Sequence, residues 1–300
     1  MYGAHTSSAL RGDYRRARAD FTVEQGWHRY SAADQVLWRR LYERQCRQLA
    51  DSACEAYIDG LARAGSATRI PDLKAVSDAL TAATGWRLVA VPGFIPDAQF
   101  FAHLAARQFP VTVWLRKPEE IDYLVEPDIF HDFFGHVPML FDPHFADFVQ
   151  RYGEQGLHAI TLDALPLVAR LYWYTVEFGL IETPKGLRAY GAGILSSAGE
   201  TAYALDSAQA LRIRFDLQRC MRTRYRIDAF QKTYFVIQSL DQLMAAIDQD
   251  LDLLLTQLRS APELDPEHLA PGDRIVAPRR SAMPIPMSKP VPPPAGVATP

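Results

Sequence analysis

Apolar residues recur at helical spacing over most of this 300-residue chain. They follow Ser31 and Asp34, a pair that can cap a helix start, and predict one long helix over 31–64. Ser239 and Gln242 form a second capping pair, which predicts a helix over 239–259. The same spacing predicts four further helices, over 72–84, 97–107, 145–155 and 163–181.

Strand patterns are confined to short stretches. Apolar runs rich in β-branched and aromatic residues predict strands over 88–91, 111–115, 225–227 and 234–237. Helix therefore dominates, and we expect a single domain that is mainly α with a small amount of β.

Changes in composition divide the chain into three regions. A polar arm over 1–23 precedes the main domain, 24–262, and a proline-rich tail follows over 263–300. Eleven of the 21 prolines fall from Pro262 onward. Because proline removes a backbone donor, residues 278–300 are predicted to be disordered.

Charge and cysteine content exclude several functional classes. The 32 basic and 35 acidic residues give a net charge of −3, without the basic excess of a nucleic-acid-binding surface. Cys46, Cys54 and Cys220 lack zinc-site spacing and are odd in number, which indicates reduced thiols. No apolar run reaches membrane-spanning length, and no secretory signal is visible. We therefore expect a cytoplasmic protein that binds neither nucleic acid nor membrane.

Two histidines and one glutamate are the candidate metal ligands. His131 and His136 lie close together in the sequence, whereas Glu177 lies inside the predicted helix 163–181, which is apolar on nearly every face. A buried glutamate is costly unless it is neutralised, paired or bound to a metal. Two imidazoles and one carboxylate form the ligand set of non-haem Fe(II) oxygenases, and they also suit zinc.

The spacing of the histidines leaves this assignment open. Five residues turn an ideal α-helix by about 500°, so the two side chains point about 140° apart. They can meet one ion only from different rotamers or where the helix is distorted, for which Gly135 and Pro138 are the candidate positions. Histidines at this spacing can also be ordinary core or surface residues, and Glu177 could pair with a buried arginine instead.

Two neighbouring residues suggest an aromatic substrate that carries a carboxylate. Trp173 lies one helical turn before Glu177 and could line an aromatic pocket or belong to the core. Arg116 can bind a substrate carboxylate through two parallel hydrogen bonds. The alternative for Arg116 is a salt bridge with a nearby carboxylate, namely Glu119, Glu120 or Asp128.

These stretches resemble the pterin-dependent aromatic amino acid hydroxylases, the family of the phenylalanine, tyrosine and tryptophan hydroxylases. Three segments carry the resemblance, and a weaker likeness runs from about residue 24 to 260; the segments are Pro127–Leu140, Leu171–Leu180 and Ala189–Glu200. The chain is most similar to the short bacterial members that hydroxylate phenylalanine. It lacks the regulatory domain and the C-terminal tetramerising helix of the animal members, so a monomer is expected.

The resemblance implies a metal site flanked by two binding sites. His131, His136 and Glu177 would hold Fe(II), and Ser197 and Glu200 would support these ligands from outside the coordination sphere. The substrate-binding residues would be Arg116, Tyr123, Leu124, Pro127, Trp173 and Ser196. The pterin-binding residues would be Gly93, Phe94, Ile95, Phe100, Asp132 and Tyr172.

Two positions depart from the animal members of the family. Asp132 stands where they carry glutamate, so its contact to pterin is expected to run through water. Leu124 stands where they carry threonine. This difference calls into question the hydrogen bond that the threonine side chain would make near the polar end of the substrate.

The activity implied is that of a phenylalanine 4-monooxygenase. Such an enzyme converts L-phenylalanine to L-tyrosine with O₂ and tetrahydropterin, the first step of phenylalanine catabolism. The alternatives are tyrosine or tryptophan hydroxylation within the same family, and a zinc hydrolase that uses the same three ligands. A non-catalytic helical protein, with a structural metal or none, is a further possibility.

Overall fold

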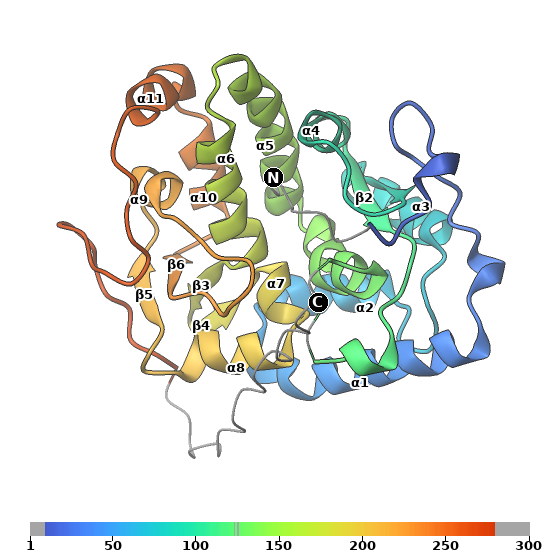
Figure 1. The fold of residues 1–300 in the computed structure, drawn as a ribbon. Helices are drawn as coiled ribbons and strands as arrows, with labels where there is room; N and C mark the ends of the chain where they lie inside the picture. The colour runs from blue at the N-terminus through green and yellow to red at the C-terminus, as the bar shows by residue number, and fades with distance from the viewer. Residues whose placement is uncertain (1–9, 123, 125, 280–300) are drawn as a thin grey trace, which may run out of the picture.

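Helices build most of the protein, for which the computed structural model describes residues 10–122, 124 and 126–279 (Figure 1). The α-helices are α1 (Ala32–Ser52), α2 (Glu55–Ala64), α3 (Leu73–Thr84), α4 (Asp97–Ala105), α5 (Pro143–Thr161), α6 (Leu165–Tyr172), α7 (Ala192–Leu195), α8 (Ala198–Asp206), α9 (Leu217–Arg222), α10 (Asp241–Ile247) and α11 (Leu251–Leu258). The strands are β1 (Arg87–Val91), β2 (Gln108–Thr112), β3 (Leu180–Thr183), β4 (Gly186–Ala189), β5 (Leu211–Arg214) and β6 (Thr233–Ile237). The predicted class, mainly α with a small amount of β, is confirmed.

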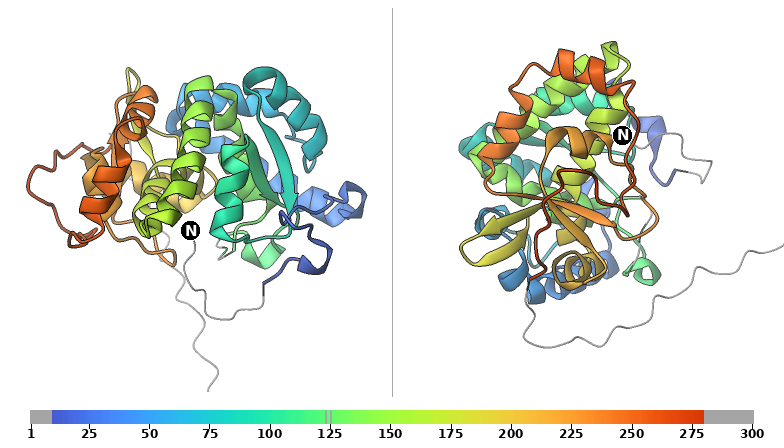
Figure 2. Two further views of the ribbon diagram at one scale, coloured as in Figure 1. Left: turned by 90° about the horizontal axis from the view of Figure 1, so that it is seen from above. Right: turned by 90° about the vertical axis from the view of Figure 1, so that its left-hand side faces the viewer.

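Two small sheets lie on opposite sides of the helices α5 and α6 (Figures 1 and 2). One sheet holds β1 and β2, which are parallel, with Leu88 opposite Phe109. The other has the order β4-β3-β6-β5, in which only β3 and β4 are antiparallel. Because α5 packs against both α4 and α10, it joins the two halves of the molecule.

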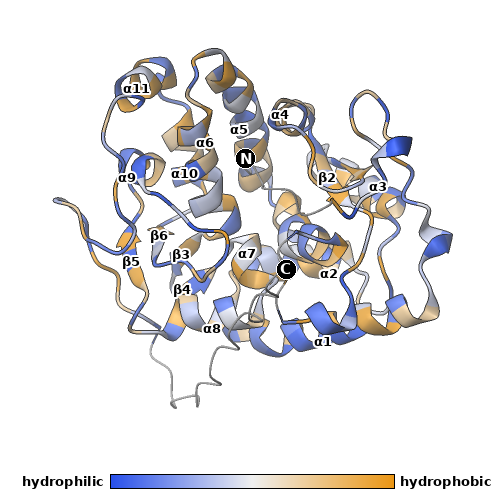
Figure 3. Ribbon diagram, in the orientation of Figure 1, coloured by the Kyte–Doolittle hydropathy of each residue, from blue (hydrophilic) through white to orange (hydrophobic). Residues whose placement is uncertain are grey.

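Aromatic residues tie the N-terminal helices to the segment that carries the histidines. The ring of Trp38 in α1 meets that of Phe130 at a centroid distance of 5.5 Å, and Phe130 stacks on Phe134 at 4.8 Å. The hydroxyl of Tyr57 in α2 donates to the carbonyl of Phe134 at 2.6 Å. In Figure 3, α1 carries both orange and blue residues, as expected for a helix with one buried face.

The predicted helix over 31–64 is two helices. Its capping pair is confirmed, since Ser31 Oγ accepts from the N–H of Asp34 at 3.1 Å and Asp34 Oδ2 accepts from the N–H of Ser31 at 2.7 Å. The helix breaks where the N–H of Cys54 donates to the carbonyl of Ala189 in β4 at 3.0 Å. A pairing with a strand so distant along the chain cannot be inferred from local periodicity.

The predicted helix over 239–259 is also two helices, α10 and α11, and its capping pair is wrong. The side chain of Gln242 accepts from the N–H of Gln238 at 2.9 Å, and no side chain caps α10. α11 has its own cap, because Asp250 Oδ1 accepts from the N–H of Leu253 at 3.3 Å. The turn between the two helices is polar. It was missed because the apolar residues on either side of it continue at helical spacing.

The strand predictions were correct for two strands and partly correct for a third. β1 and β6 are confirmed, and β2 ends at Thr112 rather than at 115. The strand predicted over 225–227 is wrong, because these residues form an irregular loop between α9 and β6. β3, β4 and β5 were not predicted, and each is only four residues long.

The segment 263–279 is more ordered than its assignment to the tail predicted. Val276 is buried, and its N–H donates to the carbonyl of Arg212 in β5 at 2.7 Å. The guanidinium of Arg279 forms a two-pronged ion pair with Asp206 at the end of α8. These contacts draw the chain against β5, so a proline-rich composition did not prevent packing. The remaining tail, 280–300, lies outside the described residues.

The described part of the N-terminal arm and the residues that follow it lie against the core. The N–H of Val23 donates to the carbonyl of Ala90 at 2.8 Å, and Trp27 Nε1 donates to the carbonyl of Ile70 at 2.8 Å. Tyr14 lies farther along the surface, where its hydroxyl donates to the carbonyl of Phe94 at 2.9 Å. The arm therefore covers the loop that follows β1.

Candidate metal centre and active site

His131 and His136 are the first and last residues of a π-helical turn. In a π-helix each N–H bonds to the carbonyl five residues earlier, and the wider turn brings residues five apart much closer to one face than an α-helix does. The helix is thus distorted where the sequence predicted, at Gly135, and the two imidazoles point to the same side. A side chain at Gly135 would place its Cβ 2.9 Å from the Cβ of Ala192, so glycine permits the close contact with α7.

Glu177 reaches the histidines from a second π-helical turn, Trp173–Glu177, which ends α6. Its carboxylate is buried and faces both imidazoles. Glu177 Oε1 lies 3.2 Å from His136 Nε2, and Glu177 Oε2 lies 3.5 Å from His131 Nε2. The helical segment ends at Glu177 rather than at residue 181 as predicted, and β3 begins at Leu180.

These three side chains fit a single metal ion. One ligand atom from each lies within 4.8 Å of the others. Two ligands held at roughly 2.1 Å from an ion and at right angles lie about 3 Å apart, close to the spacing found here. Among the residues described, no fourth acidic, histidine or cysteine side chain completes this group. The set matches a facial two-histidine, one-carboxylate iron site with open positions, not a closed structural zinc site.

The electrostatics of the three side chains favour a cation. Burial by itself would raise the pKa of Glu177, but the charges of His136 and His131 outweigh burial and hold this pKa well below its usual range. Burial would lower the pKa of His131, and the carboxylate of Glu177 reverses that effect and raises it. Protons therefore compete with a metal for this site, and metal binding must release them.

A polar network orients His131. Its Nδ1 lies 2.9 Å from Ser196 Oγ, so Nε2 is the nitrogen that faces Glu177. Its backbone N–H donates to Asp128 Oδ1 at 3.0 Å. Ser197, the other predicted supporting serine, does not contact the histidine; its Oγ caps α8 by accepting from the N–H of Glu200 at 3.3 Å.

Arg116 is paired with Asp128 inside the protein. Nε donates to Asp128 Oδ2 at 2.9 Å, and Nη2 donates to Asp128 Oδ1 at 2.8 Å. Burial would raise the pKa of Asp128, but the charge of Arg116 outweighs it and lowers this pKa. Among the residues described, no hydrogen-bond partner is found for Nη1. The pairing with Asp128 is therefore confirmed, and it leaves one edge of the guanidinium for a further carboxylate.

The residues predicted to bind pterin lie beside the histidine turn. Tyr172 at the end of α6 lies 6.2 Å from the ring of His136, and Phe100 of α4 meets Tyr172 edge to face at 5.6 Å. Because Phe100 and Tyr172 are in contact with each other, the pterin ring cannot fit between them. The two side chains therefore form a single wall on one side of the predicted pterin site. Asp132 Oδ2 accepts from the N–H of Thr112 at 2.8 Å, which ties the histidine turn to β2.

The predicted pterin loop, Gly93 to Ile95, follows β1. Gly93 has φ 152°, a conformation that requires glycine, and a Cβ there would lie 2.7 Å from Glu126 Oε1, at the end of a flexible side chain. The hydroxyl of Tyr14 donates a hydrogen bond to the carbonyl of Phe94. The loop is therefore fixed by side chains on either side of it.

Trp173 lies in the same π-helical turn as Glu177 and is almost fully buried. Its ring stacks on Tyr225 at 4.4 Å, and its Nε1 donates to Gln231 Oε1 at 2.9 Å. Leu124 and Pro127 are half-buried on the segment that leads to the histidine turn. Tyr123 lies outside the described residues.

Comparison with known proteins agrees with this geometry. Residues 19–258 match the biopterin-dependent aromatic amino acid hydroxylase family. The chain is 55% identical over 258 residues to the phenylalanine-4-hydroxylase of Chromobacterium violaceum, covering 86% of this chain and 87% of the relative. It is 53% identical over 265 residues to that of Ralstonia nicotianae, covering 88% and 85%. The crystal structure of the C. violaceum enzyme with iron and phenylalanine bound has a TM-score of 0.83 at 54% identity, covering 87% of this chain and 96% of that one.

The chain belongs to the biopterin-dependent aromatic amino acid hydroxylases. Membership of this family settles the choice between iron and zinc that the ligand set left open, since the family is defined by pterin-dependent hydroxylation. The cofactors are therefore Fe(II) and a tetrahydropterin, with O₂ as co-substrate, and a zinc hydrolase is excluded.

The sequence missed three residues of this hydroxylase site, Asp128, Tyr225 and Gln231. Asp128 was considered only as a possible salt-bridge partner, although its place three residues before His131 is a helix-capping signal. Tyr225 lies in the segment 225–227 that was predicted as a strand, and Gln231 lies farther along the same loop. Nothing in their local sequence connects them with Trp173.

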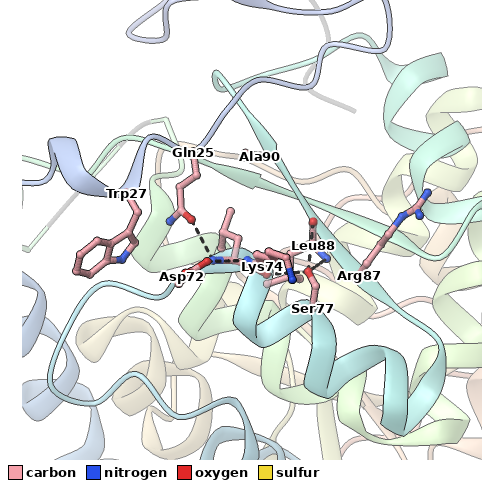
Figure 4. Close-up of a pocket in the computed structure, with 9 residues that line it drawn as sticks. Gln25, Trp27, Asp72, Lys74, Ser77, Arg87, Leu88 and Ala90 are labelled. Carbon is pink, nitrogen blue, oxygen red and sulfur yellow. Dashed lines mark hydrogen bonds between the residues drawn. The ribbon is translucent and has the colours of Figure 1, made fainter.

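One surface hollow lies away from the hydroxylase site. It is lined by residues of the N-terminal segment, α3 and β1, including Gln25, Asp72 and Ser77 (Figure 4). Gln25 Oε1 accepts from the N–H of Leu73 at 3.0 Å, and Ser77 Oγ accepts from the N–H of Leu88 at 2.8 Å. These bonds tie the segments together, and none of the predicted site residues lines this hollow.

Proposed function

We propose that this protein is a phenylalanine 4-monooxygenase that converts L-phenylalanine to L-tyrosine, the first step of phenylalanine catabolism. The observation that carries the proposal is the two-histidine, one-glutamate site, within a chain 55% identical to a phenylalanine-4-hydroxylase over 258 residues. No described helix is both long and apolar enough to cross a lipid bilayer. Three unpaired cysteines support a cytoplasmic location.

His131, His136 and Glu177 would hold Fe(II) through Nε2, Nε2 and the carboxylate. Bound iron, with tetrahydropterin as the electron source, supplies the activation of O₂ for attack on the aromatic ring. The protein's own part is to orient the ring and to keep water away. His136 and Glu177 are each only 4% exposed, so these two ligands lie in a nearly dry site, whereas His131 is half-buried.

The substrate would be held at its two ends. Arg116 would bind the carboxylate through Nη1, with Asp128 fixing the guanidinium from behind. Trp173 and Pro127 would line the ring, while Tyr123, Leu124 and Ser196 would complete the polar end. Leu124 cannot donate a hydrogen bond, so Arg116 would carry more of the binding energy of the carboxylate end.

The pterin would lie against the wall formed by Phe100 and Tyr172. Backbone groups of Gly93, Phe94 and Ile95 would bind its polar edge. Asp132 already accepts from the N–H of Thr112, so a water molecule would link the remaining carboxylate oxygen to the pterin. The protein would act as a monomer.

Product identification tests the proposal. The iron-loaded protein, supplied with tetrahydropterin and O₂, is incubated in turn with phenylalanine, tyrosine and tryptophan, and the products are separated chromatographically. We expect tyrosine from phenylalanine with the highest kcat/KM. Preferential formation of a hydroxylated tryptophan or tyrosine would overturn the choice of substrate. Sedimentation of the intact chain tests the monomer.

A further inference from the structure

Gln231 is a buried amide in the loop between α9 and β6 whose two donors and acceptor oxygen all have hydrogen-bond partners. It is 4% exposed. Its Oε1 accepts from the indole Nε1 of Trp173 at 2.9 Å. Its Nε2 donates to the carbonyls of Arg226 at 2.8 Å and Ala229 at 3.2 Å. Both donor hydrogens of the amide are therefore used, and its carbonyl oxygen, which has two lone pairs, accepts one hydrogen bond.

The chemistry of its partners fixes the orientation of this amide. An indole N–H can only donate, and a backbone carbonyl can only accept. If the amide were flipped, its NH₂ group would face the indole N–H of Trp173, and its oxygen would face the carbonyls of Arg226 and Ala229. Neither arrangement can form a hydrogen bond. The carbonyl of Gln231 must face Trp173, and its NH₂ group must face the loop.

The backbone of the same residue reaches a second part of the site. The N–H of Gln231 donates to Glu200 Oε1 at 3.0 Å, and the hydroxyl of Tyr234 donates to the same oxygen. Glu200 is buried in the first turn of α8, the helix that follows Ser196. Ser196, which bonds to the ring of His131, lies just before α8. Gln231 therefore contacts the turn that carries Glu177 through its side chain and α8 through its backbone N–H.

The stack of Trp173 on Tyr225 depends on the same loop. Tyr225 lies 4.4 Å from the indole with the rings inclined by 18°, and it belongs to the segment that Gln231 closes through Arg226. The indole is thus held by a stack on one face and by a hydrogen bond at its edge. A hydrogen bond at the edge prevents rotation within the stack, which a face contact alone permits.

We propose that Gln231 is a positioning residue that sets the orientation of Trp173 and, through it, the binding of the substrate ring. This inference rests on the proposed function, in which Trp173 lines the ring of phenylalanine. Gln231 does not touch the substrate, so it should act on phenylalanine binding and on the yield of tyrosine per pterin oxidised. It should not act on iron content.

A double-mutant cycle tests this inference. Gln231→Met keeps the length of the side chain without its polar atoms, and Trp173→Phe keeps a ring without the indole N–H. We expect Gln231→Met to raise the phenylalanine KM about fivefold to tenfold, the equivalent of one hydrogen bond, and to lower the coupling of pterin oxidation to tyrosine formation. In the Trp173→Phe background the same change should have no further effect on KM.

Gln238→Leu is the matched control, because Gln238 is exposed at the far end of β6. It should leave KM and coupling unchanged. Multiplicative effects of Gln231→Met and Trp173→Phe, or an unchanged KM in Gln231→Met, would overturn the inference. An unsubstituted protein that fails to hydroxylate phenylalanine would instead overturn the proposed function.

A measurement on the unsubstituted protein covers the case in which Gln231→Met does not fold. The indole N–H signals are recorded by ¹⁵N NMR, and the signal of Trp173 is assigned by its loss in Trp173→Phe. We expect this N–H to exchange with solvent slowly and to show the downfield shift of a hydrogen-bonded donor. Rapid exchange would show that the bond to Gln231 is not formed and would overturn the inference.

Discussion

The two π-helical turns that carry the ligands are held in different ways. Polar groups surround the histidine turn: Asp128 binds the N–H of His131, Ser196 binds its ring and Thr112 binds Asp132. In the turn Trp173–Glu177 the supporting contacts are made by a neighbour of the ligand: Trp173 donates to Gln231 and packs against Phe178 at 4.8 Å and Tyr225 at 4.4 Å.

This difference follows from what each ligand needs. An imidazole has a second nitrogen, so its orientation and tautomer can be set by a hydrogen bond from behind. A carboxylate offers both oxygens to the ion and its neighbours, and apolar surroundings strengthen its attraction for a cation. Polar substitutions should therefore affect the two turns unequally.

The largest effect is expected from Glu177→Gln. Removing the charge leaves two imidazoles and a neutral amide, so iron affinity should fall by more than the roughly 10–100-fold typical of outer-sphere partners, and nearly all turnover should be lost. The fold should survive, because a neutral side chain suits this apolar turn. Metal analysis, turnover and circular dichroism measure these outcomes.

Glu182→Gln in β3 serves as the control, since Glu182 pairs with Arg214 at the surface. Its iron content and turnover should match those of the unsubstituted protein. Normal iron content in Glu177→Gln would refute the assignment of this ligand.

Arg116→Lys should have the next largest effect, on substrate binding. A lysine cannot make parallel hydrogen bonds to Asp128 and still reach a second carboxylate, so the phenylalanine KM should rise roughly 10–100-fold. Iron content should change little. Steady-state kinetics with varied phenylalanine measure the effect, and Arg44→Lys, at a surface ion pair with Asp122, is the control. An unchanged KM would mean that Arg116 only pairs with Asp128.

Glu200→Gln should change the dependence of stability on pH. Burial raises the pKa of Glu200 to about 7, whereas the unfolded chain titrates near 4.5. Between these values the folded protein binds more protons than the unfolded one, so its free energy of unfolding falls as pH rises. Glutamine keeps an acceptor for Gln231 and Tyr234 without ionising.

The variant should therefore match the unsubstituted protein near pH 4.5 and exceed its free energy of unfolding by up to about 3 kcal/mol above pH 7. Denaturant unfolding of the iron-free proteins at a series of pH values measures this difference. A difference that does not vary with pH would contradict the raised pKa.

Ser196→Ala should have the smallest effect of the four. Loss of the bond to His131 Nδ1 should weaken iron binding about tenfold and leave the melting temperature nearly unchanged. Ser197→Ala is the matched neighbour, because it removes the cap of α8 and should instead lower stability by about 1 kcal/mol. Iron titration and thermal denaturation of both variants separate the two roles. The reverse pattern would show that α8, not Ser196, supports the histidine turn.

The sequence was informative wherever a chemical property belongs to a single residue or to a short run. The capping pair at Ser31 and Asp34 sets the start of α1, and a glutamate in an apolar helix indicated a buried charge with a partner. The five-residue spacing of His131 and His136 left different rotamers or a distorted helix as the two ways to reach one ion, and the structure has a π-helical turn there.

Contacts between distant segments decided the rest. The break between α1 and α2 depends on Ala189 in β4, and the order of residues 263–279 depends on β5. Gln231 is 58 positions from Trp173 along the chain, so no local pattern connects them. The sequence by itself determined the predominance of helix, because this follows from local periodicity, and its side-chain chemistry made His131, His136 and Glu177 the candidate ligands, with their role implied by the family resemblance. Only the tertiary structure decided which polar groups hold the ligands, because a hydrogen bond depends on the positions of both partners in space.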